Sequence, residues 1–386
     1  EMRWCKRMIY EQSDEKSKNG YVYEVDLQYP DSIKERSIHY PFCPEKMEPD
    51  TTEFTDYQNS IKPQKYKPIQ KLMMTQNDKY NYVVEGRMLD FYLEQGMILM
   101  KIHKKLKYLK SAWLKKYIEF NIEKRRESKQ NGDKFGDNFF KLLNNAFYGK
   151  TLENVRNRQD IQIVNNRDRF MKLASKPNYK TYREISPNLA AMYMNRNCIR
   201  FDKFNYIGFT VLELSKLVMY NFVYNCVYKK YNPSECSIHY TDTDSVFINF
   251  KDKEENIIAN LGSWIEENTL GKFKNELPSN QYISEAIFGK SKSYVFKIID
   301  SITKTEITKY RNKGMSKTNK LDFENFKETL FDSVTQYGKN QSLKSVNHNI
   351  HLIETKKKIL DPFDDKRVMI NNIENVPYGY FDRTET

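Results

Sequence analysis

The chain lacks paired cysteines and long apolar runs, and each absence argues against a class of protein. Its five cysteines are odd in number and form no CxxC pair, which argues against a disulfide framework and against a zinc site. The same pattern favours a reducing compartment. No stretch of eighteen apolar residues occurs, so we expect no membrane span. The first residues are polar and charged, and no secretory signal is visible among them. We therefore expect an intracellular protein.

Negative charge is also in short supply. Sixty-four Lys and Arg stand against 51 Asp and Glu, giving a net charge of +13, which favours a polyanionic partner. Nucleic acid is the leading candidate, ahead of an anionic membrane surface. The 28 Tyr and 23 Phe could stack on bases while the cations follow phosphates. An A/T-rich gene would account for part of this composition. The 386 residues, 39% of them hydrophobic, suffice for more than one domain.

The most informative segment is Tyr240-Thr241-Asp242-Thr243-Asp244-Ser245. Apolar residues alternate with polar ones on both sides of it, which predicts two strands joined at the acidic pair. Two carboxylates so close repel each other, by about 4 kcal/mol at 4 Å under an effective dielectric constant near 20. A cation would relieve this repulsion, and Mg²⁺ suits carboxylate oxygens and phosphates. The alternative is an ordinary solvated turn, because Asp and Thr both favour turns.

Other segments have readable patterns. We expect a strand over 21–27 carrying Asp26 near its end, an irregular Pro-punctuated region over 31–80, and helical periodicity from Gly86 to about Phe120. Residues 151–205 read as polar and irregular, 208–231 as an apolar helix, and 280–299 and 304–314 as strands. The last seventy residues read as a separate mixed lobe.

Residues 124–150 predict two antiparallel helices joined by Asn131-Gly132-Asp133. On the second helix, the apolar spacing of Phe139, Leu142, Leu143 and Ala146 predicts the buried face, and Lys141, Asn145 and Tyr148 share another. Arg125 and Lys129 lie one turn apart on the first helix, and their charges could converge near its tip.

Three segments in order resemble motifs A, B and C of family B DNA polymerases: 26–30 (Asp-Leu-Gln-Tyr-Pro), 141–149 (Lys-Leu-Leu-Asn-Asn-Ala-Phe-Tyr-Gly) and 240–245. Ala146 replaces the usual Ser of motif B, and the loop between Asp26 and Tyr29 is two residues shorter than usual. Further segments, at 145–158, 270–274, 292–294, 313–315 and 364–367, look like the Polinton/Maverick and related viral enzymes of the protein-primed branch. The resemblance covers nearly the whole chain.

The resemblance implies an α+β right hand with palm, fingers and thumb and two inserted subdomains like terminal-protein regions. The palm would comprise 1–30 and 206–298, the insertions 31–110 and 151–205, the fingers 111–150 and the thumb 299–386. Only 25 residues precede Asp26, so we expect no N-terminal exonuclease domain in this chain. A nuclear location or a viral replication site would fit such an enzyme.

The resemblance also implies roles for individual residues. Asp26, Asp242 and Asp244 would be catalytic and would hold two Mg²⁺ ions, or Mn²⁺, together with Leu27. Nucleotide-binding residues would be Lys141, Asn145, Tyr29, Tyr148, Arg125 and Lys129. DNA-binding residues would be Gly149, Thr243, Lys292, Tyr294, Lys313 and Gly314, with Lys292 and Tyr294 sharing one face of a strand. Partners would be a DNA template-primer, dNTPs and a terminal priming protein.

Each of these residues also has an ordinary structural reading. Lys141 could belong to a solvated helix face, Gly149 could cap a helix C-terminus, and Tyr29 could anchor a strand end. For the whole chain the alternative is a catalytically inactive nucleic-acid-binding relic of a mobile element. A reverse transcriptase is disfavoured, because its metal turn normally has adjacent aspartates and Thr243 separates these two.

Overall fold

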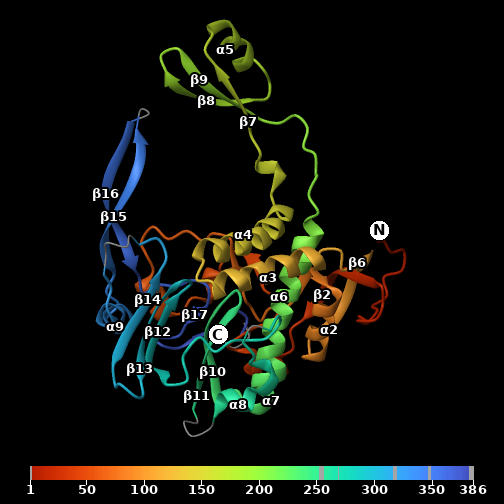
Figure 1. Cartoon of the computed structure of the whole chain (residues 1–386), viewed down its shortest axis with the longest axis vertical. Helices are drawn as coiled ribbons and strands as arrows, with labels where there is room; N and C mark the ends of the chain where they lie inside the picture. The colour runs from red at the N-terminus through yellow and green to blue at the C-terminus, as the bar shows by residue number, and fades with distance from the viewer. Residues whose placement is uncertain (1, 252–255, 268, 316–319, 347–348, 382–386) are drawn as a thin grey trace. The chain divides into compact units, whose positions relative to one another are not determined.

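The computed structural model describes residues 2–251, 256–267, 269–315, 320–346 and 349–381 (Figure 1). The chain divides into two compact units. The first comprises Glu1–Lys110, Glu213–Gln341 and Glu354–Thr386, and the second comprises Ser111–Leu212 and Ser342–Ile353. The fold is mixed α/β with small antiparallel sheets.

The largest sheet of the first unit is antiparallel, in the order β1-β6-β2-β5. Its strands are β1 (Met2–Trp4), β2 (Asn19–Gln28), β5 (Lys79–Glu85) and β6 (Ile98–Leu109). The strand predicted over 21–27 is confirmed as part of β2. Its residues Tyr21, Tyr23, Val25 and Leu27 alternate with less buried neighbours, as expected of a strand with one face in the core.

The predicted helix from Gly86 to Phe120 is wrong over its middle. Helix α2 (Gly86–Glu94) forms, but Gly96 at φ +104° ends it, and 98–109 form β6. This strand pairs with β2 from Ile98↔Gln28 to Leu109↔Asn19. The apolar spacing through Leu99, Leu106 and Leu109 was therefore not that of a helix, because pairing along the whole strand outweighs local periodicity.

Residues 31–80 are largely irregular, as predicted, and are held by the end of the chain. They contain η1 (Asp31–Ile33), η2 (Glu35–Ser37), β3 (Glu45–Met47), η3 (Thr51–Glu53), α1 (Asp56–Ile61) and β4 (Lys71–Met73). Phe54 and Met73 pack in one buried cluster with Phe363, Val368 and Tyr378, next to β17 (Val368–Met369) and β18 (Asn375–Val376). The prediction that the last seventy residues form a separate lobe is thus wrong for the segment after Leu360.

The apolar helix predicted over 208–231 is confirmed. It begins as α6 (Asn205–Tyr220), widens into the π-helical η5 (Asn221–Val227) and ends as α7 (Tyr228–Lys230). Within the first unit, Tyr220, Val223 and Tyr224 pack in the main core with β2 and with Ile238 of β10 (Cys236–Asp242). The core thus ties the acidic hairpin to the strand that carries Asp26.

The remaining elements of the first unit follow the acidic hairpin. Strand β10 pairs with β11 (Ser245–Phe250), and α8 (Ile257–Leu261) and η6 (Gly262–Trp264) follow. The strands predicted over 280–314 form the antiparallel sheet of β12 (Gln281–Lys290), β13 (Ser293–Asp300) and β14 (Glu306–Asn312). Helix α9 (Phe323–Phe331) packs on this sheet. Strands β15 (Gln336–Val346) and β16 (Asn349–Leu360) form a two-stranded ribbon, of which Ser342–Ile353 belong to the second unit.

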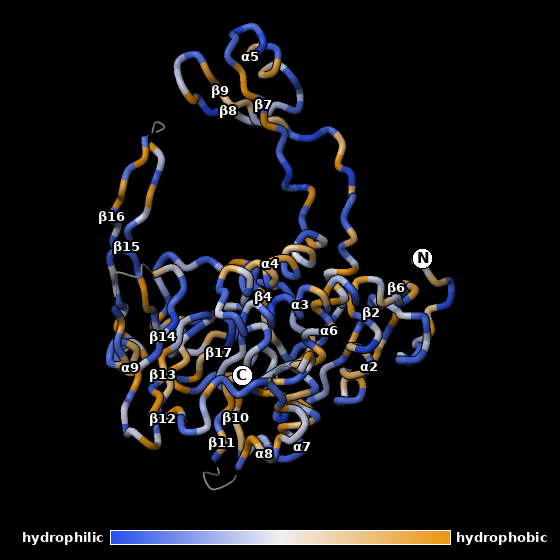
Figure 2. Tube along the Cα trace, in the orientation of Figure 1, coloured by the Kyte–Doolittle hydropathy of each residue, from blue (hydrophilic) through white to orange (hydrophobic). Residues whose placement is uncertain are grey.

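The second unit contains the predicted helix pair, α3 (Lys115–Gln130) and α4 (Lys134–Thr151). Its predicted buried face is wrong: Phe139, Leu142 and Ala146 are exposed, and Leu143 is half-buried. Apolar residues do line α4 (Figure 2). Its contact with α3 combines an aromatic pair, Tyr117 and Phe147 with ring centroids 6.2 Å apart, with small and polar residues. The side-chain amide of Asn121 donates to Asn144 Oδ1 at 2.8 Å, and a Cβ on Gly136 would clash with the Ser128 hydroxyl.

The prediction that 151–205 are irregular is also wrong. After η4 (Val155–Asn157), this segment forms β7 (Asp160–Val164), α5 (Arg167–Ala174), β8 (Tyr179–Ser186) and β9 (Leu189–Met194). The three strands make an antiparallel sheet in the order β7-β9-β8, and Val164, Leu173, Met192 and Met194 form its small core. Polar residues hid the pattern in β8 because most positions of that strand face solvent.

Candidate functional site

The turn of the acidic hairpin is very tight. Asp242 pairs with Ser245, so only Thr243 and Asp244 connect the strands. The Asp244 amide donates to the Asp242 carbonyl at 2.7 Å across Thr243, whose φ is +60°. A β-branched residue rarely adopts this left-handed conformation, which costs on the order of 1–3 kcal/mol. The predicted hairpin is confirmed, and its strain is concentrated between the two carboxylates.

The structure holds the carboxylate of Asp26 at an irregularity of β2. The pairing of β2 with both β5 and β6 shifts register next to this residue, and such bulges re-aim side chains. Asp26 Oδ1 accepts a hydrogen bond from the backbone amide of Asn81 at 2.8 Å, and His103 Nε2 lies 2.8 Å from the same oxygen. The Asn81 amide, and then His103, lower the pKa of the Asp26 carboxyl below its ordinary value.

Lys292 reaches one of the two hairpin carboxylates. Its Nζ lies 2.9 Å from Asp242 Oδ2 and 3.1 Å from Oδ1, and its backbone amide donates to the Tyr240 hydroxyl at 2.8 Å. The Asp242 carboxylate raises the pKa of Lys292 above its ordinary value. Lys292 is in the β12–β13 turn at φ +60°, so the prediction that it shares a strand face with Tyr294 is wrong. Both residues are nevertheless close to Tyr240, whose ring centroid is 5.1 Å from that of Tyr294.

Unusual backbone conformations gather around these carboxylates. Among the described residues other than glycine, six have positive φ, and three of those six are Asn81, Thr243 and Lys292. Asn81 binds Asp26, Thr243 separates Asp242 from Asp244, and Lys292 pairs with Asp242. Left-handed conformations persist where the surrounding structure imposes them and are common at functional sites. Each of these three residues is therefore at or beside one of the predicted carboxylates.

The residues fit a divalent cation by donor chemistry. Asp26, Asp242 and Asp244 offer hard carboxylate oxygens, the ligands that Mg²⁺ prefers. The side chain of Leu27 is fully buried and apolar, so only its backbone carbonyl could serve as a metal ligand. Nowhere in the described ranges do three or more His, Cys, Asp or Glu side chains gather closely enough to hold a metal ion. Two of the carboxylates instead have separate partners: Lys292 forms an ion pair with Asp242, and the Asn81 backbone amide donates to Asp26.

Tyr29 lies in the core. Its side chain is only 4% exposed, and its hydroxyl is 2.5 Å from the Ser37 hydroxyl. Its backbone amide donates to Asp78 Oδ1 at 2.8 Å. These contacts favour its reading as an anchor after β2, and Tyr29 takes no part in the site proposed below.

In the second unit, three predicted cations surround one carboxylate. Arg125 Nε lies 2.6 Å from Asp137 Oδ1. Arg125, and more weakly Lys129 and Lys141, lower the pKa of Asp137. The predicted convergence of Arg125 and Lys129 near the helix tip agrees with their joint effect on Asp137. Asp137 itself was not predicted from the sequence.

The rest of the motif on α4 is accessible. Lys141 and Asn145 are exposed and Tyr148 is half-buried. Gly149 is within α4, which ends at Thr151, so its alternative reading as a left-handed C-cap is wrong. No atom lies within 4 Å of where a Cβ on Gly149 would be, among the parts of the chain that are described.

Lys313 and Gly314 follow β14 and are exposed. Gly314 has φ +80°, which suits glycine, and its carbonyl accepts from Lys357 Nζ at 3.0 Å. The Lys313 amide donates to the Lys292 carbonyl at 3.1 Å, so this segment supports the turn that reaches Asp242.

Sequence reasoning missed His103 and Asn81, the two neighbours of Asp26. His103 was hidden because its strand was predicted as helix. Asn81 carried a usable signal, since Asn is among the residues that tolerate positive φ, but its partner depends on the sheet register.

The comparisons add no relative. A scan against protein-family models and searches of the curated proteins and of the solved structures found no match to this chain. Across the described residues, no helix is long and apolar enough to cross a membrane.

Proposed function

We propose that this chain is the polymerase region of a family B DNA-directed DNA polymerase of the protein-primed branch. It would add dNTPs to a primer 3′ hydroxyl and would replicate a mobile element or viral genome. The observation that carries the proposal is the acidic hairpin, where the strained Thr243 separates two carboxylates. Ile238 of this hairpin packs in one core with the strand that carries Asp26.

Asp26, Asp242 and Asp244 would hold the divalent ions. Two such ions lower the pKa of the attacking hydroxyl and neutralise charge on the triphosphate and the leaving pyrophosphate. The chain's own part is to fix the carboxylates. The Asn81 backbone amide and His103 stabilise the charged form of the Asp26 carboxyl and lower its pKa. The Lys292 ammonium holds Asp242 when no other cation is bound to it.

Phosphoryl transfer also needs cations beside the triphosphate. Lys141, with Arg125 and Lys129, would supply them from the helix pair, where their charges already stabilise the Asp137 carboxylate. Asn145, Tyr148 and Gly149 would contact the nascent base pair. Tyr294, Lys313 and Gly314 would contact the primer-template.

The test is Mg²⁺-dependent primer extension on a DNA template by the whole chain. Asp242→Asn and Asp244→Asn should each reduce extension by at least about a hundredfold, because a neutral amide is a poor ligand for the metal. The matched control is Asp332→Asn, a carboxylate that is exposed after α9. Undiminished synthesis by Asp244→Asn would refute the metal assignment. An RNA-template arm tests the reverse transcriptase alternative.

A second function has one structural observation and two sequence features in its favour. Lys292 already neutralises Asp242, as expected of a nucleic-acid-binding relic that no longer binds metal. Ala146 in motif B and the short motif A point the same way. Binding of primer-template without incorporation in either Mg²⁺ or Mn²⁺ would support this relic, and incorporation in either metal would reject it.

A further inference from the structure

An open groove lies beside the acidic hairpin, within the first unit. It is lined by Phe247 of β11, Glu276 and Leu277, Ile283 of β12, Tyr294 and Phe296 of β13, and residues 308–311 of β14. It encloses about 470 Å³, a size typical of small-ligand sites. Asp26, Asp242 and Asp244 do not line it, so it is distinct from the carboxylate site.

Aromatic rings form one wall of the groove. The Phe247 ring centroid is 5.7 Å from that of Tyr294 and 5.6 Å from that of Phe296. Tyr294 and Phe296 are themselves 6.1 Å apart and nearly parallel, at 23°. All three side chains are only half-buried, so their rings are open to a planar ligand. Such a wall is a stacking surface for a nucleobase.

Two cations share the sheet face of these rings. Arg311 is directly opposite Tyr294, and Lys309 is directly opposite Phe296. Residues opposite each other in an antiparallel pair project on the same side of the sheet. The other side carries Val295, which packs with Phe323 and Phe326. Aromatic and basic residues therefore meet on the face that does not bind α9.

Lys309 and Arg311 are exposed, and neither forms an ion pair with another residue in the described segments. Lys297, on the neighbouring strand, differs: its Nζ lies 3.2 Å from Glu285 and 3.5 Å from Glu306. The groove thus keeps two uncompensated positive charges beside a stacking surface. Such cations form strong, charge-assisted hydrogen bonds with phosphate.

We propose that this groove binds one nucleotide unit, with the base stacked on Tyr294 and Phe296 and its phosphate held by Lys309 and Arg311. Glu276 also lines the groove. Its carboxylate can accept from an exocyclic amine of a base but repels a second phosphate. The ligand is therefore a nucleotide unit whose base has such an amine, either free or as an unpaired residue of a single strand. Nucleotidyl transfer itself does not require this site.

The test is fluorescence anisotropy of labelled oligodeoxycytidylate with the whole chain, in chelator so that no divalent ion contributes. Lys309→Ala and Arg311→Ala should each weaken binding about tenfold, and Phe296→Leu by several-fold. The matched control is Lys46→Ala, which removes the same charge from an exposed position on β3. Unchanged melting temperatures show that the variants fold. Losses no larger than that of Lys46→Ala would overturn the proposal.

Further arms separate the sources of the ligand. Displacement of the oligonucleotide by dCMP would show that a free nucleotide suffices, and retention despite dCMP, with the variant effects intact, would assign the groove to a single strand. Equal affinity for oligodeoxycytidylate and oligodeoxythymidylate would overturn the role of Glu276. Asp244→Asn should bind like the wild type, so loss of polymerase activity and loss of groove binding are distinguishable.

Discussion

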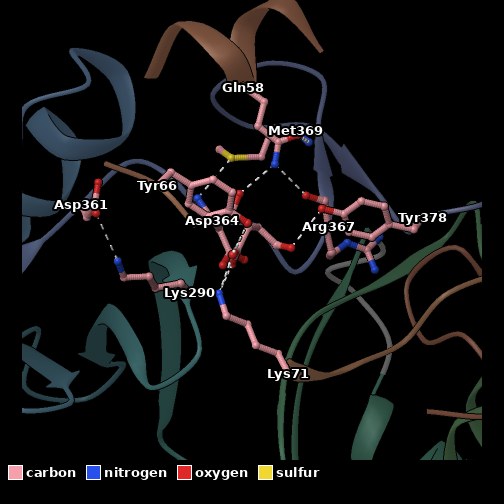
Figure 3. A network of polar contacts seen from close by, with 10 residues as sticks. Gln58, Tyr66, Lys71, Lys290, Asp361, Asp364, Arg367, Met369 and Tyr378 are labelled. Atoms are coloured by element: carbon pink, nitrogen blue, oxygen red, sulfur yellow. Dashed lines mark hydrogen bonds and ion pairs between the residues drawn. The ribbon is translucent and has the colours of Figure 1, made fainter. Parts of the chain in front are cut away.

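Replacing Lys71 by Met should loosen the C-terminal segment. Figure 3 shows that Asp364 and Arg367 are part of a polar network, to which the contacts of Asp365 also belong. Lys71 Nζ lies 2.5 Å from both carboxylate oxygens of Asp365, and the Tyr66 hydroxyl donates to Oδ2 at 2.9 Å. The Tyr378 hydroxyl donates to the Asp365 carbonyl at 3.0 Å. Met retains the stem of Lys71 and removes only its charge.

The magnitude follows from burial. The Asp365 side chain is 6% exposed and that of Lys71 26% exposed. Removing one partner of a fully buried ion pair costs about 3–5 kcal/mol. Water reaches Lys71, and Tyr66 continues to donate to the carboxylate, so we expect a loss of about 2 kcal/mol. At 1.4 kcal/mol per tenfold, opening of the segment becomes about 30-fold more frequent.

Native-state hydrogen exchange measures this opening directly. The Met369 amide donates to Gln58 Oε1 at 3.2 Å and should exchange about 30-fold faster in Lys71→Met, at the conversion of 1.4 kcal/mol per tenfold. The control is Lys67→Met, an exposed lysine in the same region. Exchange in Lys71→Met within about twofold of the control would refute the assignment of this pair as a structural clamp.

Three further predictions concern single groups. Thr243→Asn should stabilise the hairpin by about 0.5–1 kcal/mol, because Asn tolerates positive φ, and a lower melting temperature would contradict this. A thiol reagent should modify exposed Cys198 quickly and Cys43 and Cys236 only after unfolding, since burial raises the pKa of the Cys236 thiol to about 11 and raises that of Cys43 further. The pKa of Asp26 is lowered from 3.8, so its contribution to stability should be complete above that value and should decline as the pH falls through its folded pKa. Urea unfolding of Asp26→Asn and of the wild type should give free energies of unfolding whose difference vanishes in acid. A difference that stays constant with pH would refute this contribution of Asp26.

Strands with a regular alternation were predictable, and mispredicted segments had patterns that suited two structures. β10 of the acidic hairpin and most of β2 alternate apolar and polar residues. Segment 98–109 suits both structures: Ile98, Met100 and Ile102 fall at alternate positions, and the spacing of Leu99, Leu106 and Leu109 also suits a helix. Only pairing with β2 and the positive φ of Gly96 decide for a strand.

The helix α4 shows the limit of reading a buried face from apolar spacing. The apolar stripe of Phe139, Leu142 and Ala146 is exposed, with Leu142 61% exposed. Contact with α3 uses Gly136, which allows close approach, Asn144, which accepts a side-chain hydrogen bond, and Phe147, whose ring packs on that of Tyr117. A single helix's sequence does not contain the surface of its neighbour.

The sequence by itself determined the local features: a turn with two carboxylates flanked by strands, a strand ending near Asp26, and a basic helix pair. Each depends on residues close together in the chain, whose periodicity and turn preferences are local properties. Only the tertiary structure decided that Lys292 reaches Asp242, that His103 and Asn81 meet Asp26, and that Lys309 and Arg311 face the rings of β13. These are contacts between distant segments, set by sheet register and core packing, and a shift of one residue in register would move every such side chain to the other face.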